Sequence, residues 1–209
     1  MTEPYTTDGS YRKRYTALVD DFLRFATDTA AQTWLEGEFG EWAQRLSPEL
    51  RQALVAYKNS DYQDLNDNAR HGFELPQHHL VDQAIASHTL SRPVICYRGI
   101  IDGDQGIHEF VPGAEVRDLG YWSLSMLEDV AWGFASTGST PTSRVVFRVF
   151  LAAGTQVIKA AAPDIIEEMH EYELLLPRGS RFEVMAPATA KVAAANNATY
   201  YTIDVELIE

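Results

Sequence analysis

Hydrophobic residues in the first 90 positions recur every three or four residues, the spacing that buries one face of an α-helix. The clearest start signal is Ser47 followed by Pro48 and Glu49. Serine caps free backbone amides, proline fits the first helical position, and an acid is favourable in the first turn. The predicted helices span residues 15–26, 48–57, 61–70 and 77–87.

After residue 90 the pattern changes to short apolar or alternating runs separated by glycine and proline, which is typical of β-strands. Helices that precede a mostly antiparallel set of strands indicate an α+β fold rather than a doubly wound one. We therefore expect one domain with a helical portion over residues 1–90 and a β-rich portion over residues 91–209. The predicted strands span residues 93–99, 119–125, 143–151, 172–176, 181–186 and 200–208, with a short helix over residues 128–135.

The composition is that of a folded globular protein, with 45% hydrophobic and 22% charged residues in 209 positions. No apolar run approaches the roughly 20 residues that a membrane helix requires. The first residues lack the basic and apolar regions of a signal peptide. We expect a protein that is cytoplasmic in the producing cell, or one that a specialised secretion or injection route delivers into a target cell.

The formal net charge of −13 bears on the partner. A protein that binds nucleic acid by neutralising phosphates normally presents a basic face, and the one tight basic cluster here is residues 12–14. The charge balance therefore argues against a nucleic-acid partner and favours a basic protein surface.

The sequence offers little support for a metal site or a disulfide. A single cysteine, Cys96, excludes an internal disulfide, and its apolar neighbours indicate a buried structural thiol. The pairs His78-His79 and Glu167-Glu168 lack the spacing of metal ligands, and we interpret the two histidines as residues on a helix surface. Neither a G-x-G-x-x-G fingerprint nor a P-loop is present.

Three short motifs carry candidate chemistry, and the first is Tyr97-Arg98-Gly99, at the end of an apolar strand. An arginine in such a place needs an anion or a carboxylate to meet its charge. The planar guanidinium suits a phosphate, and an internal salt bridge is the structural alternative.

The second motif is the serine pair Ser123 and Ser125, separated by Leu124. Strand alternation places both serines on one face and Leu124 on the other. The two hydroxyls can then bond a polar side chain, although a serine-containing edge strand would show the same pattern.

The third motif is Glu171-Tyr172-Glu173, where period two again points both glutamates the same way. Two like charges on one face repel each other, so we expect them at an open, solvated edge or in a functional site. In a site, paired carboxylates can stabilise a developing cation and accept a proton.

In this order, the motifs resemble those of the Arg-Ser-Glu class of ADP-ribosyltransferases, which includes arginine-specific toxins. The run that follows Glu173, with the sequence LLPRGSRF, adds to the resemblance, as do residues 57–66, with the sequence YKNSDYQDLN. It covers about residues 50–208 and implies a helical portion packed on a split β-sandwich of two mainly antiparallel sheets, with NAD in the cleft. The implied reaction releases nicotinamide and transfers ADP-ribose to an arginine of a target protein, without a metal.

The resemblance also implies roles for individual residues. Arg98 would bind the NAD phosphates, and the backbone of Gly99 would hold the nicotinamide amide. Ser123 would bond the catalytic glutamate, Glu173, which would contact the nicotinamide ribose and stabilise the transition state. Glu171 would position or deprotonate the acceptor, since Glu-x-Glu accompanies arginine acceptors in this class. The remaining residues expected to bind NAD are Tyr57, Asn66, Ser125 and Arg144.

The sequence departs from the pattern of this class at two places, and three alternative functions remain. Leu124 stands where the class often has threonine, and the loop over residues 163–170, which recognises the target in the class, carries Glu167 and Glu168 where relatives often have an aromatic residue. The alternatives are an NAD glycohydrolase, an ADP-ribosyltransferase that acts on nucleic acid, and a binding module without catalysis.

Overall fold

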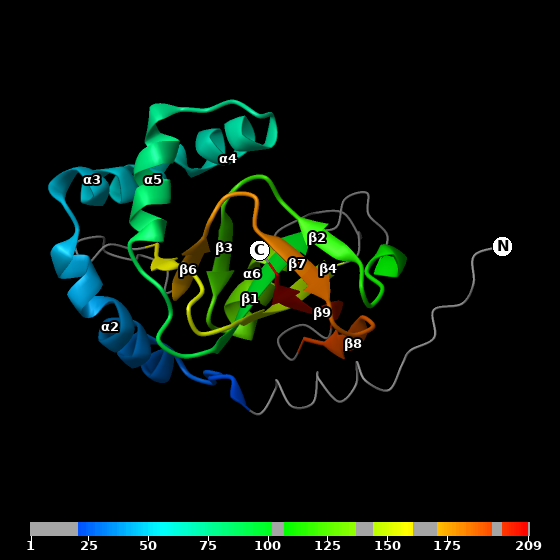
Figure 1. The fold of residues 1–209 in the computed structure, drawn as a ribbon. Helices are drawn as coiled ribbons and strands as arrows, with labels where there is room; N and C mark the ends of the chain where they lie inside the picture. Colours follow the sequence, from blue (N-terminus) through cyan, green and yellow to red (C-terminus); the bar gives the residue numbers. More distant parts are fainter. Residues whose placement is uncertain (1–20, 102–106, 137–143, 161–170, 194–197, 209) are drawn as a thin grey trace.

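The computed structural model describes residues 21–101, 107–136, 144–160, 171–193 and 198–208. In this part of the chain, four α-helices precede the first strand and lie along one side of the strands (Figure 1). They are α2 (Asp28–Arg45), α3 (Pro48–Ala56), α4 (Tyr62–Arg70) and α5 (Pro76–Ala86), with a π-helical turn, η1 (Tyr57–Asp61), between α3 and α4.

The described strands follow one hydrogen-bonded path in the order β2-β7-β9-β4-β1-β3-β6-β5, with β8 paired to β9. Their bounds are β1 (Val94–Ile101), β2 (Glu115–Arg117), β3 (Trp122–Ser125), β4 (Arg144–Leu151), β5 (Ile158–Lys159), β6 (Glu173–Leu176), β7 (Arg181–Val184), β8 (Thr189–Val192) and β9 (Thr199–Leu207). A 3-10 turn, η2 (Ile107–Glu109), precedes β2, and α6 (Glu128–Ala135) follows β3.

The pairing of β1 with β3 divides this path into two halves. These strands share one register pair, Tyr97 with Ser125, whereas β1 and β4 are paired along eight residues. All strand pairings are antiparallel except that of β4 with β9. The predicted α+β class, with helices first and mainly antiparallel strands after them, is confirmed.

Both faces of β1 are buried, which explains its continuous apolar run. Cys96 faces the main core, which the helices α2–α5 share, whereas Tyr97 faces a smaller core beneath α6. Burial raises the pKa of the Cys96 thiol, as expected of a structural cysteine. Alternation leaves Arg98 on the face of Cys96 and Gly99 on the face that α6 covers.

The predicted helix over residues 15–26 is wrong at its C-terminal end. Residues 22–26 are not helical, and residues 15–20 lie outside the described part. Leu23 forms a parallel bridge with Val94, and its backbone bonds the strand entrance through Pro93 (3.0 Å) and Ile95 (2.9 Å). An apolar segment that fits a helical stripe is therefore used here to extend β1.

The sequence pattern did not predict α2, an 18-residue helix. It buries Ala31, Leu35, Phe39 and Trp42, which have helical spacing, and Thr27 caps its start by accepting a hydrogen bond from the Ala30 amide. Two glycines inside the helix, Gly37 and Gly40, lower its intrinsic propensity, and burial of the apolar face compensates.

The interpretation of His78 as a surface residue is also wrong, although His79 is exposed. The His78 side chain is fully buried; its Nδ1 accepts a hydrogen bond from the Leu75 amide (3.0 Å), and its Nε2 lies 2.9 Å from the carbonyl oxygen of Leu65. Since Nδ1 accepts, Nε2 carries the proton and donates it. His78 thus joins α5 to α4.

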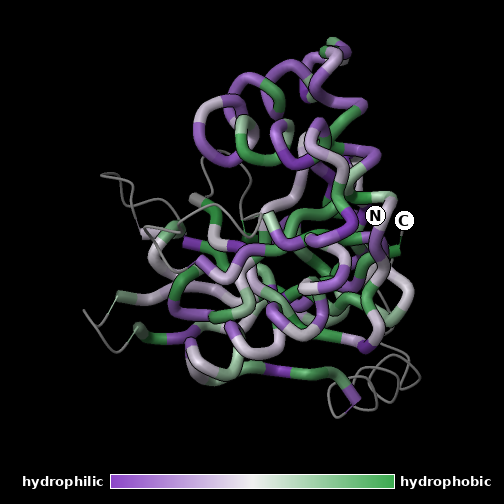
Figure 2. Tube along the Cα trace, turned by 90° about the vertical axis from the view of Figure 1, so that its left-hand side faces the viewer, coloured by the Kyte–Doolittle hydropathy of each residue, from purple (hydrophilic) through white to green (hydrophobic). Residues whose placement is uncertain are grey.

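Hydropathy follows this architecture. Hydrophobic residues concentrate in the middle of the molecule, while the helices at the top contain many hydrophilic residues (Figure 2). None of the described helices has the length and hydrophobicity needed to cross a membrane.

Asn66 fixes the helical portion to the sheet. Its side-chain oxygen accepts a 2.6 Å hydrogen bond from the backbone amide of Tyr121, just before β3. Its side-chain nitrogen donates to the carbonyl oxygen of Tyr62 (2.8 Å) and to the hydroxyl of Tyr57 (3.2 Å). These bonds hold η1 and α4 beside the start of β3, where the candidate site lies.

Candidate active site

A pocket of about 880 Å³ lies between the helical portion and the strands. This volume is toward the upper end for small-molecule sites. Its walls come from η1 and α4, from β1 and β3, from α6 and from the start of β6. The predicted site residues in its lining are Tyr57, Asn66, Arg98, Gly99, Ser123, Ser125, Glu171 and Glu173.

The serine pair faces this pocket, while Leu124 is buried in the main core, as strand alternation predicts. Ser123 donates a hydrogen bond to Oε1 of Glu173 across the β3–β6 pairing. Ser125 donates to the backbone carbonyl of Glu171 (2.8 Å) and accepts from the Leu127 amide (3.1 Å). One serine therefore orients a carboxylate, and the other fixes the backbone of the neighbouring glutamate.

Glu171 and Glu173 meet at one cation. The ammonium of Lys58, on η1, donates to Oε2 of both glutamates. Glu173 is 6% exposed, so the pair does not lie at an open strand edge as one expectation had it. β6 begins only at Glu173, and Tyr172 has a left-handed φ of 46°. The shared direction of the two carboxylates therefore depends on a turn and on Lys58 as well as on strand alternation.

Arg98 lines the same pocket as these glutamates and is tightly held. Its Nη1 donates to the carbonyl oxygen of Ser123 (3.0 Å), and its guanidinium stacks on Trp122, 5.0 Å from the ring centroid. Its Nη2 lies 3.9 Å from Asp118, at the limit of an ion pair. Burial lowers the pKa of Arg98, although a guanidinium stays protonated in proteins.

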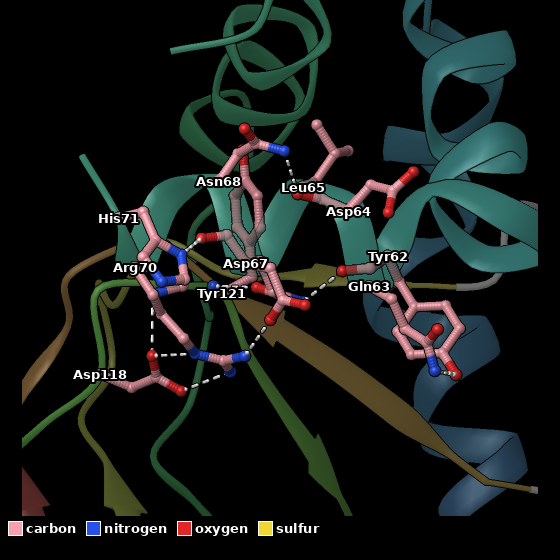
Figure 3. Close-up of polar contacts among 12 residues, drawn as sticks. Tyr62, Gln63, Asp64, Leu65, Asp67, Asn68, Arg70, His71, Asp118 and Tyr121 are labelled. Atoms are coloured by element: carbon pink, nitrogen blue, oxygen red, sulfur yellow. Dashed lines mark hydrogen bonds and ion pairs between the residues drawn. The ribbon is translucent and has the colours of Figure 1, made fainter. Parts of the chain in front are cut away.

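A second guanidinium stands beside Arg98. Arg70 makes a bidentate pair with Asp118, with both N–O distances 2.9 Å, and also contacts Asp67 (Figure 3). Burial by itself would raise the pKa of Asp118, but hydrogen bonds from Arg70 and from the Gly120 amide outweigh it and lower that pKa. An ionised Asp118 therefore holds two cations at the pocket wall.

The other predicted residues divide into two groups. Gly99 lines the pocket where α6 packs on β1, and Tyr57 and Asn66 line it from the helical side. Burial raises the pKa of Tyr57 to about 12. Arg144 does not belong to the pocket lining, because its guanidinium stacks on Trp132, 5.3 Å from the ring centroid.

Sequence reasoning missed Lys58, Arg70 and Asp118. A usable signal existed for Arg70, which follows Asn66 by four residues on one helix and therefore shares its face. Lys58 directly follows Tyr57, but the sequence predicted a regular helix here. The direction of Lys58 toward the glutamates depends on the π-helical turn η1, which was not predicted. The loop over residues 163–170, with Glu167 and Glu168, lies outside the described residues.

Within the described ranges, no group of three or more histidine, cysteine, aspartate or glutamate side chains could hold a metal ion. What the pocket does offer is two carboxylates, one of them bonded by a serine, and two guanidiniums in the same lining. Such a site can bind an anionic ligand and stabilise a positive charge within it.

Solved structures that share this fold include bacterial toxins. Plx2a, an ADP-ribosyltransferase toxin from Paenibacillus larvae, is 17% identical with a TM-score of 0.64, over 87% of this chain and 96% of that one. C3stau2 from S. aureus is 17% identical with a TM-score of 0.66, over 90% and 99%. The enzymatic component C2-I of the C2-toxin from Clostridium botulinum is 20% identical with a TM-score of 0.71; the match covers 90% of this chain but 49% of C2-I.

At such identities these structures establish the fold alone, and no curated protein matches the sequence significantly. The sequence itself gives the stronger result. Residues 31–209 match the model of the ADP-ribosyltransferase exoenzyme family. That match covers most of the chain, including every pocket residue, and confirms the resemblance predicted from the three motifs: the chain belongs to the ADP-ribosyltransferase exoenzyme family.

Proposed function

We propose that the chain cleaves NAD and transfers its ADP-ribose to an arginine side chain of a target protein. The observation that carries this proposal is the pair Glu171 and Glu173 on one side of the pocket, with Ser123 bonded to the second glutamate. NAD as the donor is supported by C3stau2, a structural neighbour whose structure contains NAD.

The diphosphate of NAD would lie at Arg98 and Arg70. Both guanidiniums line the pocket and are held in place, Arg70 by Asp118 and Arg98 by the Ser123 carbonyl, so little freedom is lost when they bind phosphate. Arginine suits this task because its planar fork bonds two phosphate oxygens at once. The stacking of Arg98 on Trp122 further limits its motion.

Glu173 would then meet the nicotinamide ribose. As the bond between nicotinamide and C1′ of the ribose breaks, its electron pair leaves with nicotinamide and positive charge develops on the ribose. A carboxylate that is preorganised by Ser123 in a buried position stabilises this charge without having to reorganise.

Glu171 would serve the acceptor. A guanidinium is attracted to a carboxylate and can form two hydrogen bonds with it. The acceptor nitrogen forms the new bond to C1′, and Glu171 takes the proton that this nitrogen loses. A glycohydrolase, which uses water, would not need this second carboxylate.

The partner would be a protein with a basic surface around the modified arginine. The net charge of −13 favours such a surface over nucleic acid. The toxins among the structural neighbours support a site of action in a target cell, reached by a specialised route.

Labelled NAD, incubated with the protein and a bacterial or host lysate, tests the proposal. We expect labelled protein and an ADP-ribose adduct on arginine by mass spectrometry, with both absent for Glu173→Gln. Label on nucleic acid, or nicotinamide release without any labelled macromolecule, would contradict the arginine-directed transfer.

A further inference from the structure

Among the described residues that line the pocket, Lys58 is the one whose side chain is bonded to the carboxylates of both glutamates. Its ammonium donates to Oε2 of Glu171 and to Oε2 of Glu173. The side chains are largely enclosed, with exposed fractions of 19% for Lys58, 17% for Glu171 and 8% for Glu173. Ion pairs in such partly buried places are worth more than pairs on the open surface.

The position of Lys58 is fixed by its backbone. It lies on η1, and π-helical turns are rare and frequently occur at functional sites. The neighbouring Tyr57 is 3% exposed and its hydroxyl is bonded to Asn66, which in turn is bonded to the Tyr121 amide. The base of the lysine side chain is thus anchored to the sheet, and only the outer part of the side chain can swing.

The proposed reaction needs a nitrogen atom in the place that this ammonium occupies. The acceptor nitrogen must contact Glu171, which takes its proton, and must reach the ribose carbon that Glu173 faces. A position between the two carboxylates satisfies both conditions, and the Lys58 ammonium lies between them. Binding of the acceptor and the observed position of Lys58 are therefore mutually exclusive.

Lys58 is not itself a suitable acceptor. Burial disfavours its charged form, but Glu173 and Glu171 outweigh this effect and raise the Lys58 pKa. A protonated amine has no free electron pair with which to attack the ribose. Of the described charged or titratable groups, Arg98 from β1 and Tyr57 from η1 also interact electrostatically with Glu173, and the neutral Ser123 from β3 donates a hydrogen bond to it.

We infer that Lys58 determines acceptor specificity by occupying the acceptor position until a guanidinium displaces it. This inference rests on the proposed function. A tethered ammonium competes at high effective concentration, so water and simple amines, which form single hydrogen bonds, displace it poorly. A guanidinium gains a bidentate pair with Glu171 and can displace it. While Lys58 is in place, its charge also opposes the positive charge on the ribose, so hydrolysis of NAD stays low.

The test compares Lys58→Met and Lys58→Arg with the wild type. Agmatine provides a small guanidinium acceptor, and cadaverine is the matched amine. Without an acceptor, we expect Lys58→Met to release nicotinamide about fivefold faster or more, the effect of losing one competing ion pair. The KM for agmatine should fall by a similar factor, and cadaverine should become a detectable acceptor.

Lys58→Arg should change the KM for agmatine in the opposite direction. Its guanidinium can bond both carboxylates more firmly than lysine does, so hydrolysis should stay at or below the wild-type rate while the KM for agmatine rises. A purely structural role would not move this KM in opposite directions in the two variants. Thermal melting of both variants shows whether each is folded at the assay temperature.

A folded Lys58→Met variant that loses hydrolysis and transfer together would overturn the inference, because Lys58 would then support the glutamates rather than compete with the acceptor. If Lys58→Met does not fold, Lys58→Arg decides: a KM for agmatine that is unchanged or lower overturns the inference. Failure of the proposed function is separate, since it appears as a wild-type protein that does not modify agmatine.

Discussion

Gly99 lies so close to Ala131 that a β-carbon at position 99 would stand 1.7 Å from the carbonyl oxygen of Ala131. The backbone nitrogen of Ala135 would also be only 2.9 Å away. The contact is between β1 and the backbone of α6, so no flexible side chain can move aside. Glycine at this position is therefore required for α6 to pack on β1 beside the pocket.

Replacing Gly99 with alanine should displace α6 and lower the free energy of unfolding by about 2 kcal/mol or more, as overpacking does. Nicotinamide release should fall as well, because α6 and β1 both line the pocket. Urea denaturation and a nicotinamide assay measure the two effects. Gly133→Ala, on the same helix but with nothing within 4 Å of the added carbon, is the control. Equal stability of the two variants would contradict the packing argument.

Asn66→Ala should destabilise the protein by about 1–3 kcal/mol, the cost of leaving buried polar groups without partners. The variant removes the bonds to the Tyr121 amide and to the Tyr57 hydroxyl. Asn68→Ala, which loses one bond to the Asp64 carbonyl on the same helix, should change the stability less. A loss of NAD affinity at unchanged stability would instead favour direct contact of Asn66 with the dinucleotide.

Much of the site could be predicted because its motifs depend on local geometry. Strand alternation alone separates Ser123 and Ser125 from Leu124. The order of the three motifs along the chain was enough to indicate the family. Arg98 was identified because an arginine at the end of an apolar run needs a partner.

The remainder depends on tertiary contacts that no local pattern encodes. The approach of Lys58 to the glutamates requires a π-helical turn, whose sequence is indistinguishable from that of a regular helix. Asp118 becomes part of the site only because α4 brings Arg70 to it. His78 was misplaced for the same reason, since its burial follows from the packing of α5 on α4.

Arg98→Lys should lower kcat/KM for NAD by more than about tenfold although the charge is kept. A lysine can neither make a bidentate bond to phosphate nor bond Ser123 and stack on Trp122 at once. Steady-state nicotinamide release measures the effect, and Arg45→Lys, at an exposed position in the last turn of α2, is the control. If Arg98→Lys kept its turnover and its NAD affinity, Arg98 would be only a structural residue.

Glu173→Gln should abolish both transfer and hydrolysis, with a loss of about a hundredfold or more, the typical cost of removing a preorganised transition-state stabiliser. The amide keeps the shape of the side chain and can still accept the hydrogen bond from Ser123. The melting temperature of the Glu173→Gln variant should therefore stay above the assay temperature. Glu49→Gln, in the exposed first turn of α3, controls for the loss of a charge. Nicotinamide release near the wild-type rate would show that Glu173 does not stabilise the ribose.

Glu171→Gln separates transfer from hydrolysis. The variant loses the carboxylate that attracts the acceptor and takes its proton, but Glu173 keeps its bond to Ser123 and its place beside the ribose. We expect modification of arginine to fall by about a hundredfold or more, while a substantial part of the NAD hydrolysis remains. The weaker hold on Lys58, which then pairs with Glu173 alone, would help water to enter. Nicotinamide release and acceptor labelling are measured in parallel on one preparation. If both fall to background, the two glutamates act as one unit, and if neither falls, the acceptor is not an arginine.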